Sequence, residues 1–304
     1  MAAKSRRKLQ ELDLDRHMIQ RPPNDLTKSA PHSFVESMQL LGETYTVRHV
    51  MVPLPRIEYV APGGEVKARE IVAEKKYSVV PASKDGESFD AVFNTESSPD
   101  GGRTVTTLEP TSVSDYIPDS TPLAEAFFLF ESREWYLTLR GNRVSGLITY
   151  WAFNSREFRV QLYAGISRSE ELSRNVLATD GCGVSSREGL DLASDVLDKA
   201  QTQFDSSRKK LGGNRFVDEL QFHHVHDALR KHLRWRDFLH ERLGRELSNK
   251  EYGRLYDFTK LRDGVMHGRV LIPSYRDFQS FSGMVDNIGK LIGHLDAYSV
   301  PDTA

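Results

Sequence analysis

The sequence of 304 residues contains a single cysteine, Cys182. One cysteine excludes an intrachain disulfide framework and a cysteine-rich zinc cage, and it is typical of a reducing compartment. The first residues are partly basic but precede no apolar segment, and no uninterrupted apolar run approaches ~18 residues. We therefore predict a cytoplasmic protein without a membrane partner.

The sequence also lacks an excess of charge of either sign. Its 41 basic and 43 acidic residues give a formal net charge of −2, so the whole chain has no electrostatic bias toward nucleic acid. The distribution is uneven, however. Residues 208–269 contain 15 Lys or Arg against nine Asp or Glu, and they hold six of the ten histidines. This stretch is the candidate for contact with a polyanion.

Four segments differ in composition. Residues 1–44 are polar and interrupted by prolines, which predicts an N-terminal arm that is partly disordered or helical. Residues 45–155 alternate short β-branched runs with turns and short helical stretches. Residues 156–185 are predicted as a connecting helix and linker, and residues 186–304 have helical periodicity. The predicted fold class is α+β, with small sheets followed by an all-α bundle of four or five helices.

An internal repeat organises the second segment. Helices are expected at 65–75 and 123–130, and strands at 77–82, 90–93, 135–139 and 144–150, with a polar connector at 94–112. The spacings recur in both halves: Val66 to Val79 and Leu123 to Tyr136 span thirteen positions, and Gly86 to Asn94 and Gly141 to Thr149 span eight. The order strand, helix, strand, strand therefore occurs twice, and two such units should pack against each other around a cleft.

These residues resemble a tandem pair of cystathionine-β-synthase-type (CBS) domains. The resemblance rests on VRHVMVPLPRIEYVAPGGEVKAREIVAEKKYSVVPA in the first half and on VSDYIPDSTPLAEAFFLF and GNRVSGLITY in the second. It implies that an adenosine-type nucleotide effector binds in the cleft through Gly-x-x-Thr-x-x-Asp, with Thr on phosphate and Asp on ribose. The second half retains Thr149 but has Ala152 in place of Asp.

The candidate ligand-binding residues are Thr149, Ser78, Tyr136 and Asn94. The alternative is that the pair is a dimerisation scaffold with an empty cleft.

The histidines of the C-terminal segment raise the question of a metal. His223 and His226 are three positions apart and share a helix face, but no carboxylate completes a recognised motif such as His-Glu-x-x-His. The favoured interpretation is that they are solvated or capping residues, so we predict no metal site and no required cofactor. A histidine-metal hydrolase is the alternative.

The sharper motif is Lys-Leu-Arg-Asp-Gly-Val-Met-His-Gly-Arg at 260–269, which follows an amphipathic helix capped by Ser248 and Glu251. It resembles the higher eukaryotes and prokaryotes nucleotide-binding (HEPN) domain, whose ribonuclease members carry Arg, a polar residue and then His. The resemblance implies a homodimer in which Arg262 and His267 are catalytic and Asp263 is auxiliary.

The residue chemistry of this motif suits metal-independent cleavage of RNA. A histidine titrates near pH ~6.5 and can take or give a proton, and an arginine holds phosphate through two parallel hydrogen bonds. Five helical positions separate two side chains by about 140°, so Arg262 and His267 are expected to meet only if the helix ends or bends near Gly264. The alternative is a pair that merely caps a helix end in an inactive domain.

Basic residues next to an aromatic side chain complete the candidate RNA interface. Arg230, Arg234 and Arg236 are predicted to attract phosphate and Trp235 to stack on bases. The alternative is a solvated face of an amphipathic helix, which is the commoner case. The predicted function is a nucleotide-regulated endoribonuclease, an architecture that suits a toxin or an antiviral defence effector. The alternative function is a non-catalytic ligand-sensing or RNA-binding dimer.

Overall fold

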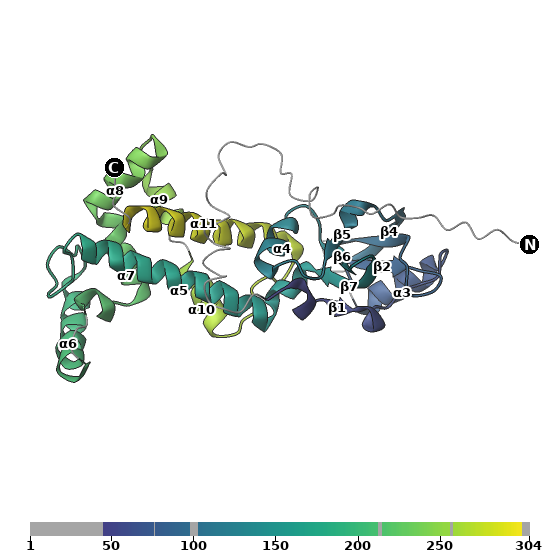
Figure 1. Ribbon diagram of the computed structural model, residues 1–304, viewed down its shortest axis with the longest axis horizontal. Helices are drawn as coiled ribbons and strands as arrows, with labels where there is room; N and C mark the ends of the chain where they lie inside the picture. The colour runs from purple at the N-terminus through teal and green to yellow at the C-terminus, as the bar shows by residue number, and fades with distance from the viewer. Residues whose placement is uncertain (1–44, 76, 98–102, 212–214, 256–257, 300–304) are drawn as a thin grey trace, which may run out of the picture.

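The computed structural model describes residues 45–75, 77–97, 103–211, 215–255 and 258–299. The predicted arm at 1–44 lies outside these residues. Figure 1 shows an elongated molecule with both sheets at one end and helices along the remainder. Within the described residues, no helix combines the length and apolar character needed to cross a membrane.

Both halves of the N-terminal part contain the predicted strand, helix, strand, strand order. The first copy consists of Val60, α3 (Glu65–Lys75), β2 (Val79–Ala82) and β3 (Ala91–Ser97), and the second of β5 (Tyr116–Pro118), α4 (Leu123–Leu129), β6 (Trp135–Arg140) and β7 (Arg143–Thr149). In each copy the last two strands are antiparallel. The first strand pairs in parallel, as a single bridge from Val60 to Ala82 and as the β5–β6 ladder. The predicted repeat is thus a repeat of structure.

The polar connector predicted at 94–112 is wrong in part. Residues Arg103–Pro110 form β4, which pairs antiparallel with β3 and completes a sheet of order β2-β3-β4. The segment reads RTVTTLEP, and its β-branched Thr and Val residues favour a pleated, half-buried surface even though most of them are polar. The polarity of residues 103–110 led to the prediction of a loop, but their high β-propensity is consistent with the strand that they form.

The first residues of the described chain cross to the second copy. After η1 (Val47–His49), the short strand β1 (Val52–Pro53) pairs antiparallel with β7, so the second sheet has the order β1-β7-β6-β5. The turn η2 (Leu54–Arg56) then leads back toward the first copy. The two copies are therefore linked by strand pairing as well as by side-chain packing.

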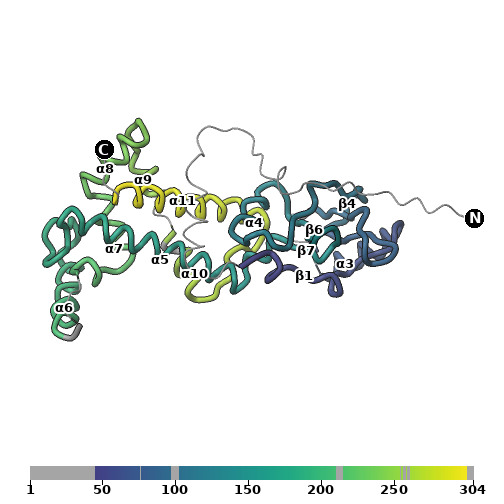
Figure 2. Tube along the Cα trace, in the orientation of Figure 1, coloured from purple at the N-terminus to yellow at the C-terminus, as the bar shows by residue number. Residues whose placement is uncertain are grey.

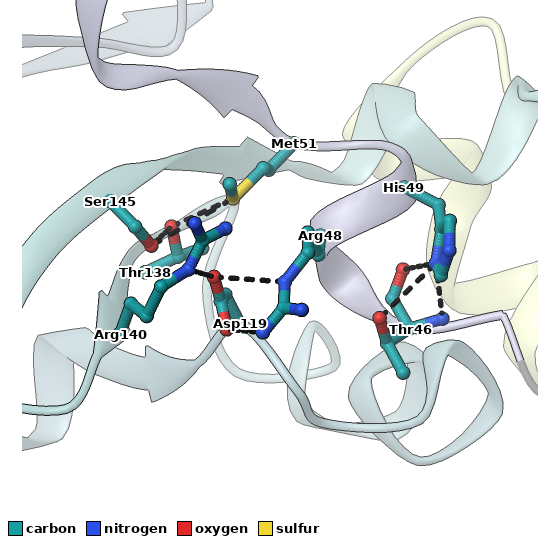
Figure 3. A network of polar contacts seen from close by, with 8 residues as sticks. All are labelled: Thr46, Arg48, His49, Met51, Asp119, Thr138, Arg140 and Ser145. Carbon is teal, nitrogen blue, oxygen red and sulfur yellow. Dashed lines mark hydrogen bonds and ion pairs between the residues drawn. The ribbon is translucent and has the colours of Figure 1, made fainter.

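An ion triad fastens this crossing segment (Figure 3). The buried carboxylate of Asp119 accepts hydrogen bonds from Arg48 Nη2 at 2.8 Å and from Arg140 Nε at 2.8 Å. Burial alone would raise the pKa of the Asp119 carboxyl, but the hydrogen bonds from the two arginines outweigh it and hold the pKa below its usual value. Asp119 stays ionised near neutral pH and joins η1 to the end of β6.

Apolar side chains from both sheets fill the space between the two copies. Buried residues of the first copy and its entry segment meet those of the second in one cluster: Ile57, Val79, Phe89, Val92, Trp135, Leu137 and Leu147. The predicted cleft is therefore packed with side chains at its centre.

The rest of the chain is helical. After η3 (Val113–Asp115) and η4 (Tyr150–Asn154), the helical elements are α5 (Arg156–Thr179), α6 (Ser194–Leu211), η5 (Phe216–Glu219), α7 (Phe222–Lys231), α8 (Leu233–Leu243), α9 (Asn249–Leu255), α10 (Thr259–Met266) and α11 (Tyr275–Ser299). The all-α prediction holds for the described residues beyond 186. Six α-helices lie there, more than the four or five expected, because the periodic stretch at 215–267 is broken by short turns.

The helix predicted as a connector, α5, lies in the centre of the helical part. Ten of its 24 residues are buried, including Phe158, Leu162, Ile166 and Val176. It runs in the same direction as α11, since Phe158 packs near Phe281 and the residue after α5, Asp180, accepts a hydrogen bond from Tyr298. The tube in Figure 2 shows the two helices side by side along the molecule. The boundary at 156–185 therefore does not separate two cores.

One continuous core joins the second copy to these helices. Phe127 of α4 stacks on Phe158 of α5 with ring centroids 5.1 Å apart, and it lies 4.9 Å from Phe278 of α11. The cluster that contains them extends from Val47 to Leu295. The second β-α-β-β unit and the helices are thus one packed body.

The pairing of β1 with β7 leaves no room for a side chain at position 146, which is glycine. A Cβ there would lie 2.6 Å from the carbonyl oxygen of Val52 and 2.9 Å from Met51 Sδ. We expect Gly146→Ala to lower the free energy of unfolding by about 1–3 kcal/mol in urea titrations. Gly253→Ala in α9, where nothing lies within 4 Å, is the control and should be neutral or stabilising. An unchanged midpoint for Gly146→Ala would contradict the crossing.

Candidate functional site

The motif at 262–267 lies at the end of α10. The helix ends in a Schellman motif: Gly268, with φ +64°, donates its N–H to Val265, and Arg269 donates to Gly264. His267 is the C-cap residue and its side chain is exposed. The sequence pattern placed the helix end near Gly264, but the left-handed residue that ends it is Gly268.

Gly264 has a packing role instead of a hinge role. It is buried inside a helix that continues to Met266, and an added Cβ would lie 3.1 Å from Leu271 Cδ2. Helix α10 therefore neither ends nor bends at Gly264, and the condition for Arg262 and His267 of one chain to meet is not fulfilled there. A straight helix leaves Arg262 and His267 about 140° apart around its axis.

Arg262 is held by an aromatic ring. Its guanidinium carbon lies 5.2 Å from the ring centroid of Phe222, and Nη1 lies 4.0 Å from Asp263 Oδ1. Phe222 is buried and packs edge-on against Phe258, with centroids 5.5 Å apart. This stack orients the Arg262 guanidinium and leaves about a third of its side chain exposed.

The loop after His267 is fastened to the β-α-β-β module by a residue that the sequence patterns did not indicate. Asn154, the last residue of η4, accepts hydrogen bonds from the N–H groups of Leu271 and Ile272 at 2.8 and 2.9 Å. Its amide nitrogen donates to the Ile272 carbonyl at 2.9 Å. All three contacts span more than 110 positions of sequence, so no local signal announces them.

Arg159 adds a second contact at the same place. Its Nη1 donates to the carbonyl of Gly268 at 3.1 Å, so a guanidinium from α5 lies beside the C-terminus of α10. A cation is favourable there because the last helical carbonyls carry partial negative charge. The Arg159 Nε is buried and has no hydrogen-bond partner within the described residues.

The candidate ligand residues divide into two groups. Asn94 and Thr149 both adjoin Trp135: the Trp135 Nε1 donates to Asn94 Oδ1 at 3.2 Å, and Thr149 is the strand partner of Trp135. Ser78 lies nearby, where its carbonyl accepts a hydrogen bond from Thr95 Oγ1 at 2.8 Å. These three are brought together at the edge of the packed interface between the copies.

Tyr136 does not join them. Because side chains alternate along β6, Tyr136 lies on the opposite face from Trp135. Its hydroxyl donates to the carbonyl of Leu129 at 2.8 Å and its ring packs against Phe130, with centroids 5.0 Å apart. The assignment of Tyr136 to the ligand cleft is wrong, since the thirteen-residue spacing locates the strand but not its face.

Arg103 lies beside the grouped candidate ligand residues instead of Tyr136, and it belongs to β4, the strand that was not predicted from the sequence. Arg103 in β4 has 8% of its side chain exposed and donates to Glu134 Oε2 at 2.8 Å and to Thr95 Oγ1 at 3.1 Å. Glu134 immediately precedes Trp135, so Arg103 lies close to Asn94 and Thr149. The Glu134 carboxylate already pairs with this guanidinium, so a phosphate at this place would have to compete with Glu134 for Arg103.

The predicted stacking residue Trp235 is completely buried. Its ring stacks on Phe238 with centroids 5.7 Å apart and meets Tyr298 edge-on at 5.5 Å. Its role as a base-stacking surface is wrong, because burying a large indole in the core outweighs its proximity to cations in the sequence.

The three predicted RNA-binding arginines have different surroundings. Arg234 is 75% exposed and lies 3.3 Å from Asp180, while Arg230 lies 4.0 Å from Asp227. Arg236 covers the ring of Tyr252 at 5.0 Å. Arg230 and Arg236 line a common pocket, with a volume of about 320 Å³, between α7, α8 and α9.

The histidines do not form a chelating pair. His223 is exposed, whereas His226 is buried beside Phe222, and burial together with Arg174 and His223 lowers the pKa of His226 to about 3. In the described part of the chain, no group of three or more His, Cys, Asp and Glu residues is arranged to hold a metal ion. The metal-hydrolase alternative gains no support from this arrangement.

Cys182 belongs to a structural cluster at the end of α5. Its Sγ lies 3.5 Å from His232 Nε2, which is also 3.5 Å from Asp180 Oδ2. The backbone N–H of Trp235 donates to His232 Nδ1 at 3.3 Å. The proton of the neutral imidazole is therefore on Nε2, and Nε2 cannot accept the proton of the Cys182 thiol. Burial raises the pKa of the Cys182 thiol, so this residue is not an activated nucleophile.

The burial of Trp235 predicts how its removal behaves. Trp235→Ala should lower the free energy of unfolding by about 3–5 kcal/mol because it leaves a large cavity. Trp151, which is 52% exposed, is the matched control, and Trp151→Ala should change stability by less than about 0.5 kcal/mol. Thermal or urea unfolding monitored by circular dichroism measures both. Wild-type stability of Trp235→Ala together with weakened RNA binding would instead support the stacking role.

No protein-family model and no curated protein matches the sequence. Among solved structures, the chain is similar to the CBS domain of a bacterial CNNM/CorC-family Mg2+ transporter in complex with ATP, at 17% identity over 40% of this chain and 92% of that one, with a TM-score of 0.29. It is also similar to CBSX2 in complex with AMP, at 20% identity over 38% and 98% of the two chains and a TM-score of 0.31. A hemolysin-like protein containing a CBS domain from Oenococcus oeni PSU is 15% identical over 38% and 92%, with a TM-score of 0.27.

Proposed function

We propose that the chain is a ligand-regulated endoribonuclease, in which a CBS-type pair senses a nucleotide and a HEPN-type helical part cleaves RNA. The observation that carries the proposal is the placement of the Arg262–His267 motif. An oriented arginine and an exposed histidine lie on one short helix, and the loop that follows is held by Asn154 of the β-α-β-β module.

The chemistry needs no group beyond these side chains. The 2′-hydroxyl oxygen of RNA attacks the adjacent phosphorus and the bond to the 5′-oxygen breaks, giving a 2′,3′-cyclic phosphate and a 5′-hydroxyl. One histidine takes the 2′-hydroxyl proton and another gives a proton to the leaving oxygen. Arg262 contacts the phosphate as negative charge develops, and Asp263 orients Arg262.

A second copy of the chain would complete this site. Because α10 is straight, Arg262 and His267 of one chain face different directions, and one chain supplies a single motif histidine. Four exposed apolar side chains lie within four positions of the contact between Arg159 and Gly268: Val160, Tyr163, Met266 and Val270. We propose that this surface joins two copies and places His267 of each near Arg262 of the other.

The sensor would act through η4. Thr149 precedes this turn as its N-cap residue, and Asn154 ends it five residues later. A nucleotide phosphate contacted by Thr149 and Arg103 would therefore affect the position of η4, whose last residue, Asn154, is hydrogen-bonded to the loop after His267. Any ligand that binds two arrangements of η4 with different affinity shifts the arrangement of the catalytic loop by the same free energy.

The cleavage proposal predicts a specific loss of activity. In EDTA, the wild-type chain should cleave labelled RNA, and His267→Ala should reduce the rate by about 10²–10⁴-fold because proton transfer is lost. Arg262→Ala should reduce it by about 10²–10³-fold. His223→Ala, which removes an exposed histidine from α7, is the control and should retain activity.

Two outcomes would contradict that expectation. Full activity of His267→Ala or Arg262→Ala would reject the assigned site. Absence of cleavage with every adenosine nucleotide tested would reject the enzyme and leave the non-catalytic RNA-binding dimer.

The coupling proposal predicts the behaviour of Asn154→Ala. The loss of three hydrogen bonds should lower stability by about 1–3 kcal/mol, and the fold-change in cleavage caused by the effector should fall toward one. The nucleotide should still raise the melting temperature, because Asn154 is not part of the ligand site.

Ser155→Ala provides the matched control for Asn154→Ala. It removes only the N-cap of α5, where Ser155 Oγ accepts from Phe158 N at 3.2 Å, so it should cost about 1 kcal/mol and leave regulation intact. Equal loss of regulation in both variants would show a general effect of destabilisation and contradict the relay.

A further inference from the structure

We propose that the pocket between α7, α8 and α9 binds a backbone phosphate of the RNA substrate, away from the Arg262–His267 motif. The pocket has a volume of about 320 Å³ and is lined by Arg230, Lys231, Arg236, Asn249 and Tyr252. The identity of the ligand as substrate RNA rests on the proposed function, whereas the preference for a phosphate rests on the pocket itself.

The charge of the lining favours an anion. Three of its five residues are cationic, and none of the described residues that line it is acidic. Arg230 and Lys231 do have carboxylates nearby, Asp227 at 4.0 Å and Asp191 at 3.6 Å, but these are outside the lining and all four side chains are nearly half exposed or more. Exposed pairs of this kind contribute little, so a phosphate can replace them.

Arg236 is the best-oriented of the three cations. Its guanidinium lies 5.0 Å over the ring of Tyr252, a residue that is 1% exposed. The Tyr252 hydroxyl lies 3.0 Å from His240 Nε2 and 3.4 Å from the carbonyl of Arg236, so the ring is fixed between α8 and α9. No carboxylate of the described residues lies within 4.0 Å of Arg236. The Arg236 side chain also interacts with the Tyr252 hydroxyl, and the N–H groups that do not face this hydroxyl are available to an anion such as phosphate.

The pocket is suited to the RNA backbone and not to a base. Its aromatic residue is already covered by Arg236, and the nearby Trp235 is buried in the core, so neither offers a face for stacking. The side-chain amide of Asn249 adds a neutral hydrogen-bonding group at the pocket wall. Such a set positions a strand without reading its sequence.

Helix α7 relates this pocket to the catalytic motif. Phe222, on which Arg262 stacks, is the first residue of α7, and Arg230 follows eight positions later. The helical rise separates these two positions by about 12 Å along the axis. Eight positions also turn the two side chains about 80° around the axis, so a strand that wraps around α7 is needed to engage both places at once.

Binding of RNA tests the pocket separately from cleavage. We would titrate the full chain carrying His267→Ala with a labelled single-stranded RNA at several salt concentrations and follow fluorescence anisotropy. Arg236→Gln should weaken binding about tenfold and reduce the slope of log affinity against log salt by about 0.7, the value for one lost phosphate contact. Arg236→Lys should lose less, because it retains the charge but not the bidentate geometry.

Arg187→Gln is the matched control for Arg236→Gln. It removes an exposed arginine that pairs with Asp198 outside the pocket, and it should leave affinity and slope unchanged. If Arg236→Gln melts below the assay temperature, the double variant Arg230→Gln/Lys231→Gln, with both residues exposed, takes its place and should weaken binding similarly.

Three results would overturn the proposal. The first is the same salt slope in the pocket variants and the wild type, and the second is an equal effect of Arg187→Gln. The third is competition by inorganic phosphate or a nucleoside monophosphate at the concentration of the RNA, which would make this a site for a free phosphate ligand. Pocket-dependent binding in this assay, together with no cleavage of RNA by the wild-type chain, would reject the nuclease and leave the phosphate pocket standing.

Discussion

The rest of the structure depends on the burial of helix α5. Its ten buried residues recur at intervals of three and four, so they form a stripe from Phe158 to Leu177, nearly the whole helix. One end of that stripe packs on Phe127 of the second β-α-β-β copy, and the other is fastened where Asp180 meets Tyr298 and Arg234. Because the same stripe serves both parts of the molecule, a displacement of the second copy cannot leave the helices unchanged. Because the side chains on both sides of α5 are closely packed, a shift of the second copy requires the helices to repack.

Local periodicity in the sequence was sufficient to predict most elements but not their partners. The helix expected at 65–75 is α3, and the four expected strands lie within a few residues of their predicted positions. Period alone reports which face is apolar, and it carries no information on what covers that face. The crossing of β1 to β7, the addition of β4 and the central position of α5 are all matters of partner choice over long sequence separation. These were the features that the sequence could not provide.

The candidate site shows the same division between local and non-local information. Gly268, two positions after Met266, is an ordinary helix stop, so the end of α10 was predictable from the sequence; attention went to Gly264 instead because a meeting of Arg262 and His267 required the helix to end or bend there. Tyr136 and Trp235 were chosen for their aromatic rings, but a large ring gains more free energy in a core than at a surface, and both are buried. The roles of Asn154 and Arg103 could not be predicted from the sequence, since Asn154 bonds to Ile272, more than 110 positions away, and Arg103 pairs with Glu134, 31 positions away.

The partners of the arginines, more than their number, decide which of them can meet an anion. Arg174 and Arg215 are engaged by carboxylates and by carbonyl or amide oxygens of the fold. The guanidinium carbons of Arg262 and Arg236 instead lie 5.2 and 5.0 Å from the ring centroids of Phe222 and Tyr252, within the range of a cation–π contact. Such a contact does not neutralise the guanidinium, and N–H groups that no carboxylate occupies can bind a phosphate. The net charge of −2 therefore says little about this surface, because it does not report which arginines are neutralised by carboxylates and which lie over aromatic rings.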